Sequence, residues 1–381
     1  MKKALIYASV ASMIQQFNMN NIRLLLSLNY QVDVACNFEF GSTITTDKIE
    51  QLKGELTNLG VHYYHIPVPR KISDIYHLKT SYKKTIDLMN RENYDLIHCH
   101  SPIGGIICRM ANHKSHNYEK CRMIYTAHGF HFFNGNNPVK NLIFRNIEKI
   151  GARYTDVLIT INKEDYAAAQ RFHLKRGGKV EYIPGIGIDL EKIDSVPEMR
   201  KQLLHSLHLS ADSVLMLSVG ELNDNKNHRV IIETLPNLPH NFHYLICGLG
   251  PLMAEHQKLA ENLGVSERLH LLGFRNDVLS VMKSCDLFVF PSKREGLSVA
   301  LMEALACELP CIASNIRGNS DLILDKKNGL LVSLNKQEEW KSKIMELVQL
   351  KESGMTIQSQ NMHMYSVASI MNKMECIYIG R

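Results

Sequence analysis

Residues 285–314 carry the pattern that most constrains the fold of this chain. The apolar run CDLFVF ends at Pro291, and the run CIAS begins directly after Pro310. Between them, residues 299–305 place apolar side chains at helical spacing, and Ser298 precedes them as a candidate N-cap residue. Short apolar runs joined by one helix are typical of buried parallel strands. The segment therefore predicts a strand, a loop, a helix and a second strand of an α/β sheet.

Two carboxylates of this segment stand at positions suited to a ligand site. Glu295 falls in the loop at the carboxyl end of the first strand, and Glu303 falls about one and a half turns into the helix. In open α/β sheets ligands bind at that edge, where a helix N-terminus offers free N–H groups to an anion. A phosphate near residues 296–298, flanked by hydroxyl groups that donate to the two carboxylates, has the layout of a sugar nucleotide. Two glutamates near a helix start are common, however, so their spacing alone does not decide between a site and a solvated helix.

The length of 381 residues predicts two domains, because one hydrophobic core seldom extends so far. A polar connection near 190–200 separates two series of strands and helices. We expect an N-terminal domain at 1–190, a C-terminal domain at 191–365, and a last helix at 366–381 that packs back on the first domain. Both domains are predicted to be doubly wound α/β domains with parallel sheets, whose strand-end loops face one cleft.

Composition excludes several classes of protein. The chain is 45% hydrophobic and 22% charged, which is typical of a globular protein, and no run of about 18 uncharged apolar residues occurs. MKKALIYASV is predicted to be a first strand rather than a signal peptide. The nine cysteines are scattered singly without C-x-x-C, which indicates reduced thiols in a cytoplasm. No H-E-x-x-H or D-x-D motif occurs, so we expect neither a metal nor a cofactor, and a nucleotide sugar would be a substrate.

Basic residues are concentrated in the first half of the chain. Residues 1–189 hold 24 Lys and Arg against 16 Asp and Glu, whereas residues 190–381 hold 20 against 22. An anionic partner, such as membrane lipid or a diphosphate, would suit the basic half, and a merely solvated surface is an equal alternative. The helical pattern at 138–153 separates apolar from basic positions, as in a membrane-surface or partner-facing helix, although packing on its own domain is the commoner outcome. No nucleic-acid-binding motif is present, so we expect no nucleic acid partner.

Two histidines follow neighbouring predicted strands of the first half. His100 ends the strand in DLIHCH, before Gly104 and Gly105, which allow close approach of the backbone. His128 ends the strand in RMIYTAH, so both imidazoles are predicted to point into one crevice. A structural role is the alternative for each histidine. The loop after the first strand, at 8–17, has no glycine, so the dinucleotide fingerprint of a nicotinamide enzyme is absent.

The second half repeats the arrangement of strand-end loops. Lys226 follows the strand in SVLMLSVGEL and could reach a phosphate as a point charge. Gly248 and Gly250 lie in the turn after the strand FHYLIC and could admit a nucleotide.

These motifs together resemble the retaining glycosyltransferases of family 4, which have the GT-B fold. The resemblance covers nearly the whole chain, and its N-terminal motifs look like those of the EpsD-type enzymes of bacterial exopolysaccharide clusters. The motifs that carry it are HCHSPIGG (98–105), TAHGFHF (126–132), IPGIGID (183–189), GEL (220–222) with Lys226, CGLGP (247–251), GFRNDV (273–278) and REGLSVALMEALA (294–306).

The resemblance implies a role for each matching residue. Glu295 would bind donor-sugar hydroxyls, Glu303 the ribose hydroxyls, and Lys226 the diphosphate leaving group. Arg275 lies in the loop that resembles the base-binding loop, and His128 would stand near the reacting sugar. The expected catalytic residues are His128, Lys226 and Glu295. The expected donor-binding residues are Gly220, Lys226, Gly248, Gly250, Arg275, Glu295, Gly296, Leu297, Ser298 and Glu303, and the acceptor-side candidates are His100, Gly104, Gly105 and His131.

Two positions depart from the pattern of the family. The resemblance leads us to expect an arginine where the chain has Glu221, so Arg294 or Arg317 would have to supply the missing cation. A Gly-rich loop is expected after the first strand, where the chain has Ala11 and Ser12.

The resemblance implies transfer of a hexose or N-acetylhexosamine from a nucleotide sugar, expected to be a UDP-sugar, to a lipid-linked or oligosaccharide acceptor. Such a transferase would serve exopolysaccharide or capsule biosynthesis and biofilm formation. It would work beside other enzymes of that pathway and make peripheral contact with the inner face of the cell membrane. Two alternatives stay open: a GT-B sugar-nucleotide epimerase and a non-catalytic scaffold of the same fold.

Overall fold

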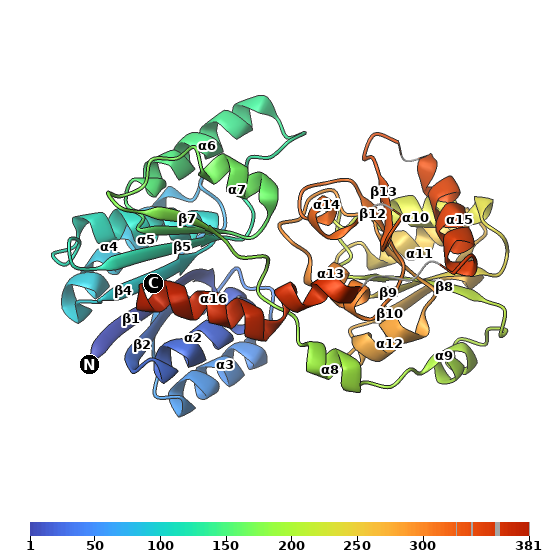
Figure 1. Ribbon diagram of the computed structural model, residues 1–381, viewed down its shortest axis with the longest axis horizontal. Coiled ribbons are helices and arrows are strands. Elements are labelled where there is room, and N and C mark those ends of the chain that lie inside the picture. The colour runs from blue at the N-terminus through green and yellow to red at the C-terminus, as the bar shows by residue number, and fades with distance from the viewer. Residues whose placement is uncertain (325, 337, 355–358, 381) are drawn as a thin grey trace. The chain divides into compact units, whose positions relative to one another are not determined.

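The computed structural model describes residues 1–324, 326–336, 338–354 and 359–380 (Figure 1). The chain divides into two compact units. Unit 1 comprises Met1–Ile186 with Ile370–Arg381, and unit 2 comprises Gly187–Ser369. The first boundary between the units thus falls slightly before the predicted boundary at 190. The chain returns to unit 1 at Ile370, which lies within the last helix.

Unit 1 is built on a sheet of seven parallel strands in the order β3-β2-β1-β4-β5-β6-β7. β1 is central, since Ala4 pairs with Val32 of β2 on one side and with Leu96 of β4 on the other. Both faces of such a sheet must be covered, and residues 4–8 of β1 are accordingly fully buried. The strands are β1 (Lys2–Val10), β2 (Tyr30–Asn37), β3 (His62–His65), β4 (Leu96–His100), β5 (Arg122–Ala127), β6 (Val157–Thr160) and β7 (Lys179–Tyr182).

Helices cover both faces of this sheet because side chains alternate along each strand. Ala4, Ile6 and Ala8 pack in the core formed with α1, α2, α3 and α16, whereas Leu5 and Tyr7 pack in the core formed with α4, α5, α6 and α7. The helices are α1 (Ala11–Phe17), α2 (Met19–Ser27), α3 (Thr46–Asn58), α4 (Ile75–Glu92), α5 (Pro102–Lys114), α6 (Pro138–Ala152), α7 (Lys163–Ala169) and α16 (Val367–Ile379).

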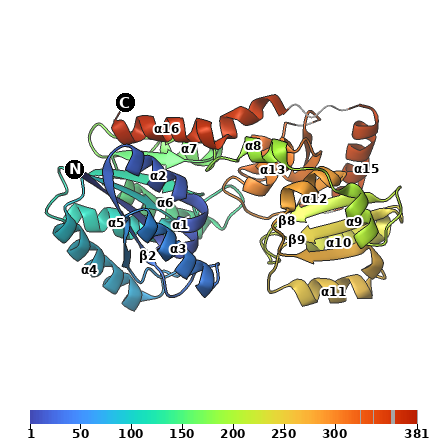
Figure 2. The same cartoon turned by 90° about the horizontal axis from the view of Figure 1, so that it is seen from below.

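The last helix of the chain completes the first of these cores. α16 runs beside α2 (Figures 1 and 2) and contributes Ile370, Met374, Ile377 and Tyr378 to the buried cluster. The hydroxyl of Tyr378 also lies 2.8 Å from Nδ1 of His98 on β4. Unit 1 therefore contains both ends of the chain.

The polar residues after the first strand predict a turn before a helical segment that starts at Phe17, but the segment after β1 is helical from its first residue. α1 begins directly at Ala11, with Ser12 in its first turn, and α2 follows after the single residue Asn18. Ala, Met, Ile and Gln, which make up most of this segment, form helices readily, and no Gly or Pro interrupts them. The prediction of a turn was therefore wrong, since a helix occupies the place of the family's Gly-rich loop.

Unit 2 is built on six parallel strands in the order β10-β9-β8-β11-β12-β13. The strands are β8 (Val214–Val219), β9 (Phe242–Cys247), β10 (Leu269–Gly273), β11 (Leu287–Phe290), β12 (Cys311–Ser314) and β13 (Gly329–Val332). The α-helices are α8 (Leu190–Ser195), α9 (Arg200–Ser206), α10 (Arg229–Thr234), α11 (Met253–Asn262), α12 (Val278–Ser284), α13 (Val299–Ala306), α14 (Asn319–Leu322) and α15 (Glu339–Glu352), and the 3₁₀ turns are η1 (Leu235–Asn237), η2 (Ser266–Arg268) and η3 (Ser359–Tyr365).

The strand order of unit 2 reverses between β8 and β11. After β8 the chain adds β9 and β10 on one side, and then crosses to β11 on the other side. The loops that follow β8 and β11 diverge at this point, and such a switch point is where open α/β sheets bind ligands. Both units are thus doubly wound, as predicted. Within the described residues, no helix has the length and apolar character needed to cross a membrane.

Candidate active site

The loops after β8 and β11 are joined to each other by hydrogen bonds. The N–H of Lys293 donates to the carbonyl oxygen of Asn225 at 2.7 Å, and Nδ2 of Asn225 donates to the carbonyl oxygen of Arg294 at 2.9 Å. Nδ2 of Asn227 also donates to the carbonyl oxygen of Pro291 at 3.2 Å. The two loops are therefore held in a fixed relation at the switch point of the sheet.

This arrangement brings Lys226 and Glu295 into contact. Nζ of Lys226 donates to Oε1 of Glu295 at 2.8 Å, and the two side chains are only 19% and 14% exposed. Nζ also lies 4.7 Å from the centre of the Phe290 ring. The lysine stem passes close to Gly220, where an added Cβ would lie 3.0 Å from Cε of Lys226. Three of the predicted donor residues thus form one compact group.

The start of α13 lies directly beside this group. Ser298 caps the helix as predicted, since its hydroxyl accepts from the N–H of Leu301 at 3.3 Å. Within the described chain, the N–H groups of Gly296, Leu297 and Ser298 donate to no acceptor. Free N–H groups at a helix N-terminus attract anions, and here they stand next to a lysine.

Glu303 lies further along α13 and is half-buried. Burial raises the pKa of its carboxyl group, and Lys192 opposes that change. Its carboxylate makes no hydrogen bond or ion pair with any described residue. A largely shielded carboxylate in this state can still accept hydrogen bonds from hydroxyl groups of a ligand.

Arg275 is engaged within its own loop. Its guanidinium donates to both carboxylate oxygens of Asp277, from Nε at 2.8 Å and from Nη2 at 2.5 Å. Arg275 accordingly lowers the pKa of Asp277. The hydrogen bonds of Arg275 to its own loop leave the planar face of the group, rather than this bidentate edge, for contact with a base.

Close contacts within unit 2 account for the glycines of the turn after β9. A Cβ added to Gly248 would lie 1.9 Å from the carbonyl oxygen of Gly220, and one added to Gly250 would lie 2.4 Å from that of Leu222. The loop after β8 therefore packs on these glycines. They shape the site by allowing two loops to meet, whether or not a nucleotide also approaches them.

In unit 1, His100 and His128 are in direct contact. Nδ1 of His100 lies 3.1 Å from Nε2 of His128. His98 lies beside His100, with the ring centres 4.1 Å apart and the ring planes tilted by 42°, and Nε2 of His98 lies 2.8 Å from Oγ1 of Thr126. Sequence reasoning missed His98, although the H-x-H spacing on a strand places both histidines on the same face.

These three imidazoles are kept neutral by burial. Burial lowers the pKa of His98 to about 3, lowers that of His128 to about 4, and holds that of His100 well below its usual value. A cavity of about 30 Å³ adjoins them, which is close to the space that one water needs. At neutral pH His128 can donate or accept a hydrogen bond, but it carries no charge for a leaving phosphate.

The other acceptor-side candidates have structural partners. A Cβ on Gly104 would lie 2.8 Å from Oγ of Ser9, and one on Gly105 would lie 2.5 Å from the ring of Tyr125, so both glycines let α5 pack closely on the sheet. His131 packs edge-on against Phe144 of α6, with ring centres 5.1 Å apart. Both rings line a mainly apolar cavity of about 290 Å³, together with Arg70, Lys71, Ile72, Ser73, Pro102, Ile103, Ile106, Ile147 and Glu148.

Comparison with known proteins assigns the chain to a family. Residues 15–192 match the family described as Glycosyltransferase Family 4, and residues 200–363 match the one described as Glycosyl transferases group 1. A Bacillus subtilis protein named as the glycosyltransferase EpsD is 31% identical over 351 residues, which is 91% of this chain and 87% of that protein. The chain belongs to the family 4 glycosyltransferases. An Escherichia coli relative, UDP-Gal:alpha-D-GlcNAc-diphosphoundecaprenol alpha-1,3-galactosyltransferase, is 31% identical over 84% of this chain and 81% of its own length.

Solved structures show the same GT-B fold. HepE of Anabaena in complex with UDP superposes with a TM-score of 0.75 at 17% identity, and each chain is covered completely. Sucrose-phosphate synthase from Thermosynechococcus elongatus superposes with a TM-score of 0.77 at 17% identity, over 100% of this chain and 99% of that one. These structures confirm the predicted fold class, and the family assignment above confirms the predicted enzyme class.

In this glycosyltransferase, the expected cation next to Gly220 is replaced by an exposed glutamate. Glu221 accepts from Nδ2 of Asn223 at 3.0 Å, within its own loop. Arg317 is buried, and its Nε donates to the carbonyl oxygen of Glu295 at 3.2 Å. Arg294 is exposed at the loop surface. Of the two suggested substitutes, Arg317 is the one in contact with the predicted donor residues.

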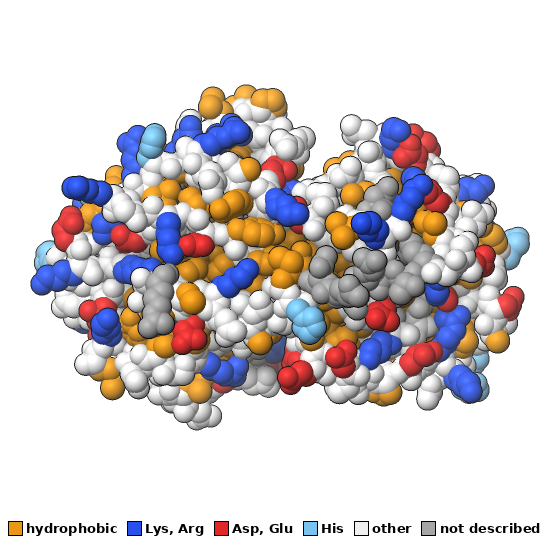
Figure 3. Space-filling view, in the orientation of Figure 1, with side chains coloured by type: hydrophobic (Ala, Val, Ile, Leu, Met, Phe, Trp, Pro, Cys, Tyr) orange, Lys and Arg blue, Asp and Glu red, His pale blue; other side chains and the backbone are white. Residues whose placement is uncertain are grey.

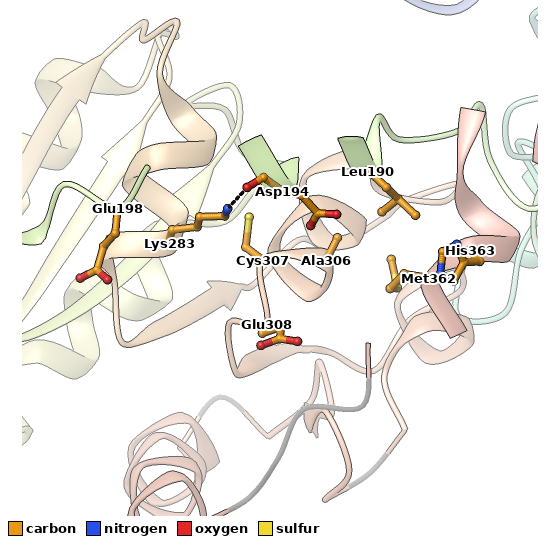
Figure 4. Close-up of a pocket in the computed structure, with 9 residues that line it drawn as sticks. All are labelled: Leu190, Asp194, Glu198, Lys283, Ala306, Cys307, Glu308, Met362 and His363. Atoms are coloured by element: carbon orange, nitrogen blue, oxygen red, sulfur yellow. Dashed lines mark hydrogen bonds between the residues drawn. The ribbon is translucent and has the colours of Figure 1, made fainter. Parts of the chain in front are cut away.

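A separate cavity of about 520 Å³ lies at the other end of α13 (Figure 4). Asp194, Glu198 and Glu308 contribute carboxylates to its lining, and Lys283 donates to the carbonyl oxygen of Asp194 at 3.3 Å. None of the predicted donor residues lines this cavity. Three carboxylates against one lysine would also repel a diphosphate, so this cavity is not the site predicted for the donor.

The neutral histidines of unit 1 predict a loss of stability in mild acid. Because the folded-state pKa values of His98 and His128 lie below the unfolded value of about 6.5, their contribution is complete above that pH. It is lost as the pH falls toward 4, by at most about 1.4 kcal/mol per pH unit for each histidine. Urea unfolding at pH 7.5 and pH 5 measures this loss. We expect His128→Asn to reduce the pH dependence of the unfolding free energy, and His116→Asn, at an exposed histidine, to leave it unchanged. Equal pH dependence in the wild type and both variants would contradict the assignment of the acid-induced loss to the buried histidines.

Proposed function

We propose that this glycosyltransferase transfers a hexose or N-acetylhexosamine from a UDP-sugar to a lipid-linked glycan, with retention of the anomeric configuration. The observation that carries the proposal is the contact of Lys226 with Glu295 beside the free N–H groups of residues 296–298. The pathway we propose is the synthesis of a bacterial exopolysaccharide or capsule.

The donor would be held by groups of opposite character. Lys226 and the N–H groups at the start of α13 would bind the diphosphate, which carries negative charge. Glu295 would then exchange its bond to Lys226 for hydrogen bonds from sugar hydroxyls, and Glu303 would accept from the ribose. Each of these groups suits one part of a sugar nucleotide, and no metal ion is needed to neutralise the phosphates in this scheme.

The reaction we infer proceeds on one face of the sugar. The bond between the anomeric carbon and the phosphate oxygen breaks while the acceptor oxygen bonds to the same face of that carbon. The proton of the acceptor hydroxyl passes to the departing phosphate oxygen. Lys226 and the α13 N-terminus stabilise the charge that develops on that phosphate. In this scheme Glu295 accepts hydrogen bonds from the sugar hydroxyls in the bound state, which favours this route over one in which Glu295 is a carboxylate nucleophile.

Relatives support a lipid-linked acceptor and a UDP donor. The Escherichia coli relative is named for transfer from UDP-Gal to a diphosphoundecaprenol-linked sugar. A Campylobacter jejuni relative, 35% identical over 123 residues, is also named for a diphospho-undecaprenol-linked substrate. The structurally similar HepE holds UDP.

The surface of α6 suits an acceptor that resides in a membrane. Four apolar side chains of α6 are about half exposed or more, at 65% for Val139, 63% for Leu142, 49% for Ile143 and 47% for Ile150. Figure 3 shows hydrophobic side chains beside Lys and Arg side chains over this helix. We propose that this face makes the peripheral membrane contact, because apolar side chains flanked by cations bind anionic lipid surfaces.

α6 also packs on its own unit through its opposite side. Nη2 of Arg109 donates to Oε2 of Glu148 at 2.9 Å, and the hydroxyl of Tyr125 donates to Oε1 of the same carboxylate at 2.9 Å. All three side chains are buried. One side of α6 therefore packs on its own unit, and the other side is exposed, as the proposed membrane contact requires.

Donor binding and transfer test the proposed chemistry. UDP and UDP-sugars should raise the melting temperature of the wild type, because a ligand that binds only the native state stabilises it. Lys226→Ala and Glu295→Ala should each lower transfer of radiolabelled sugar at least about a hundredfold, while retaining the fold, because each removes a charge from the reacting region. Lys293→Ala is the matched control, since only the backbone of Lys293 contacts the loop after β8.

Other outcomes would identify the alternatives. Conversion of a UDP-sugar without any acceptor would indicate an epimerase. Donor binding without transfer to any lipid-linked acceptor would favour a scaffold. Unchanged turnover in either alanine variant would contradict the role proposed for that residue.

Sedimentation with vesicles tests the membrane contact. The double variant Leu142→Ser, Ile143→Ser should bind vesicles that contain anionic lipid at least about tenfold more weakly, because less apolar surface would enter the lipid. Leu334→Ser, at an apolar residue that is 38% exposed in unit 2, is the control and should bind as the wild type does. Equal vesicle binding by the wild type, the double variant and Leu334→Ser would rule out the exposed face of α6 as the membrane contact.

A further inference from the structure

A continuous chain of buried hydrogen bonds crosses three neighbouring strands below the site. Nδ1 of His228 lies 2.9 Å from the hydroxyl of Tyr244 on β9, which lies 2.8 Å from Oγ of Ser218 on β8. Oγ of Ser218 in turn donates to the carbonyl oxygen of Val289 on β11. Ser218 and Tyr244 are fully buried and His228 is 1% exposed.

The two ends of this chain coincide with the two halves of the donor site. His228 is two residues after Lys226 and immediately precedes α10. Val289 immediately precedes Phe290, whose ring lies against Nζ of Lys226, and the loop that carries Glu295 begins at the next residue. The chain therefore connects the base of the lysine loop to the base of the glutamate loop through the centre of the sheet.

The direction of every proton in the chain follows from its last member. The carbonyl oxygen of Val289 can only accept, so the hydroxyl proton of Ser218 is committed to it. Ser218 must then accept from Tyr244, and Tyr244 must accept from His228. Only the neutral imidazole with its proton on Nδ1 satisfies this order without adding charge to the core, and burial, which lowers the pKa of His228 to about 3, agrees with a neutral ring.

The imidazole of His228 also contacts the lysine loop. Nε2 of His228 makes no hydrogen bond of good geometry with the described residues, but the backbone of Glu221 interacts with the ring and opposes the lowering of its pKa. The nearest aromatic neighbours include His256, with ring centres 6.1 Å apart. An apolar side chain of similar size would remove the hydrogen bond between position 228 and the buried hydroxyl of Tyr244, so the histidine completes the chain of hydrogen bonds as well as filling space.

We propose that His228, Tyr244 and Ser218 are positioning residues of the donor site, which hold Lys226 in register with Glu295. The proposal rests on the proposed function, because it requires that Lys226 bind the diphosphate. None of the three side chains needs to touch the donor. The chain of hydrogen bonds sets the separation between the two loops, and loss of one of these hydrogen bonds lets the loop that carries Lys226 shift.

Binding of UDP in a double-mutant cycle tests this role. We expect Tyr244→Phe to weaken UDP binding about tenfold in the wild-type background and to have no further effect in the Lys226→Ala background, as measured by calorimetry. Ser218→Ala breaks the chain at its other end and should behave in the same way. Tyr7→Phe is the matched control, because Tyr7 is also fully buried and its hydroxyl contacts Thr85 at 3.0 Å, in unit 1.

Substitutions of His228 test the direction of the protons. His228→Asn retains a donor near the position of Nδ1 and should restore most of the binding that His228→Leu loses. Transfer rates at saturating donor should follow the same order. A merely structural role would instead follow the melting temperatures of the variants and would weaken binding equally in both backgrounds.

The outcomes separate this inference from the proposed function. Failure of the wild type to bind UDP would overturn the proposed donor and this inference with it. Binding of UDP that depends on Lys226 but is unchanged in Tyr244→Phe and Ser218→Ala would overturn the inference alone. An equal loss of binding in both backgrounds would also overturn it.

Discussion

The ion pair between Lys226 and Glu295 is the interaction on which the candidate site depends. It joins the two loops that diverge where the strand order of unit 2 reverses. Both groups are largely shielded from water, so the attraction between them must offset the loss of hydration of each charge. Such a pair contributes little to net stability, but it fixes two side chains before any ligand arrives. Preorganisation of this kind is how enzymes stabilise charge in a transition state without moving their own groups.

Polar groups without hydrogen-bond partners among the described residues also indicate the position of the site. Most buried polar groups in a native protein have partners. In the described part of unit 2, the exceptions at the sheet edge include the N–H groups of residues 296–298 and the carboxylate of Glu303. The opposite case is Arg275, whose guanidinium already donates two hydrogen bonds to the carboxylate of Asp277. Local hydrogen bonding thus distinguishes groups available to a ligand from groups that hold a loop in shape.

Much of the architecture was predictable because it depends on local periodicity. The strand at 311–314 and the cap at Ser298 agree with the prediction, since both follow from residues adjacent in sequence. The start of α1 was missed because the polar residues after the first strand suggested a turn, whereas Ala11, Met13 and the two glutamines of that segment favour a helix. His98 was missed because only the residues at the strand ends were taken as candidates. Alternate residues of a strand share one face of the sheet, so His98 and His100 could have been paired from the sequence.

Contacts that depend on strand order could not be predicted from the sequence. His228 and Tyr244 are 16 residues apart, and Ser218 and Val289 are 71 apart, and they meet only because β9, β8 and β11 are neighbours in the sheet. The glycines at 104, 105, 248 and 250 show a related limit. Their spacing indicates that something approaches closely, but only the structure shows that side chains and backbone of the same unit do so.

The position of α16 has a consequence for synthesis of the protein on the ribosome. Unit 2 is one continuous segment of chain, whereas the core of unit 1 includes Ile370, Met374, Ile377 and Tyr378 from the last helix. Domains usually fold in the order in which they emerge. Here the N-terminal unit cannot close its core until residues 370–378 have left the exit tunnel. Unit 2 can therefore complete its contacts before unit 1 does, and the nascent unit 1 leaves the surface that α16 covers exposed until that helix emerges.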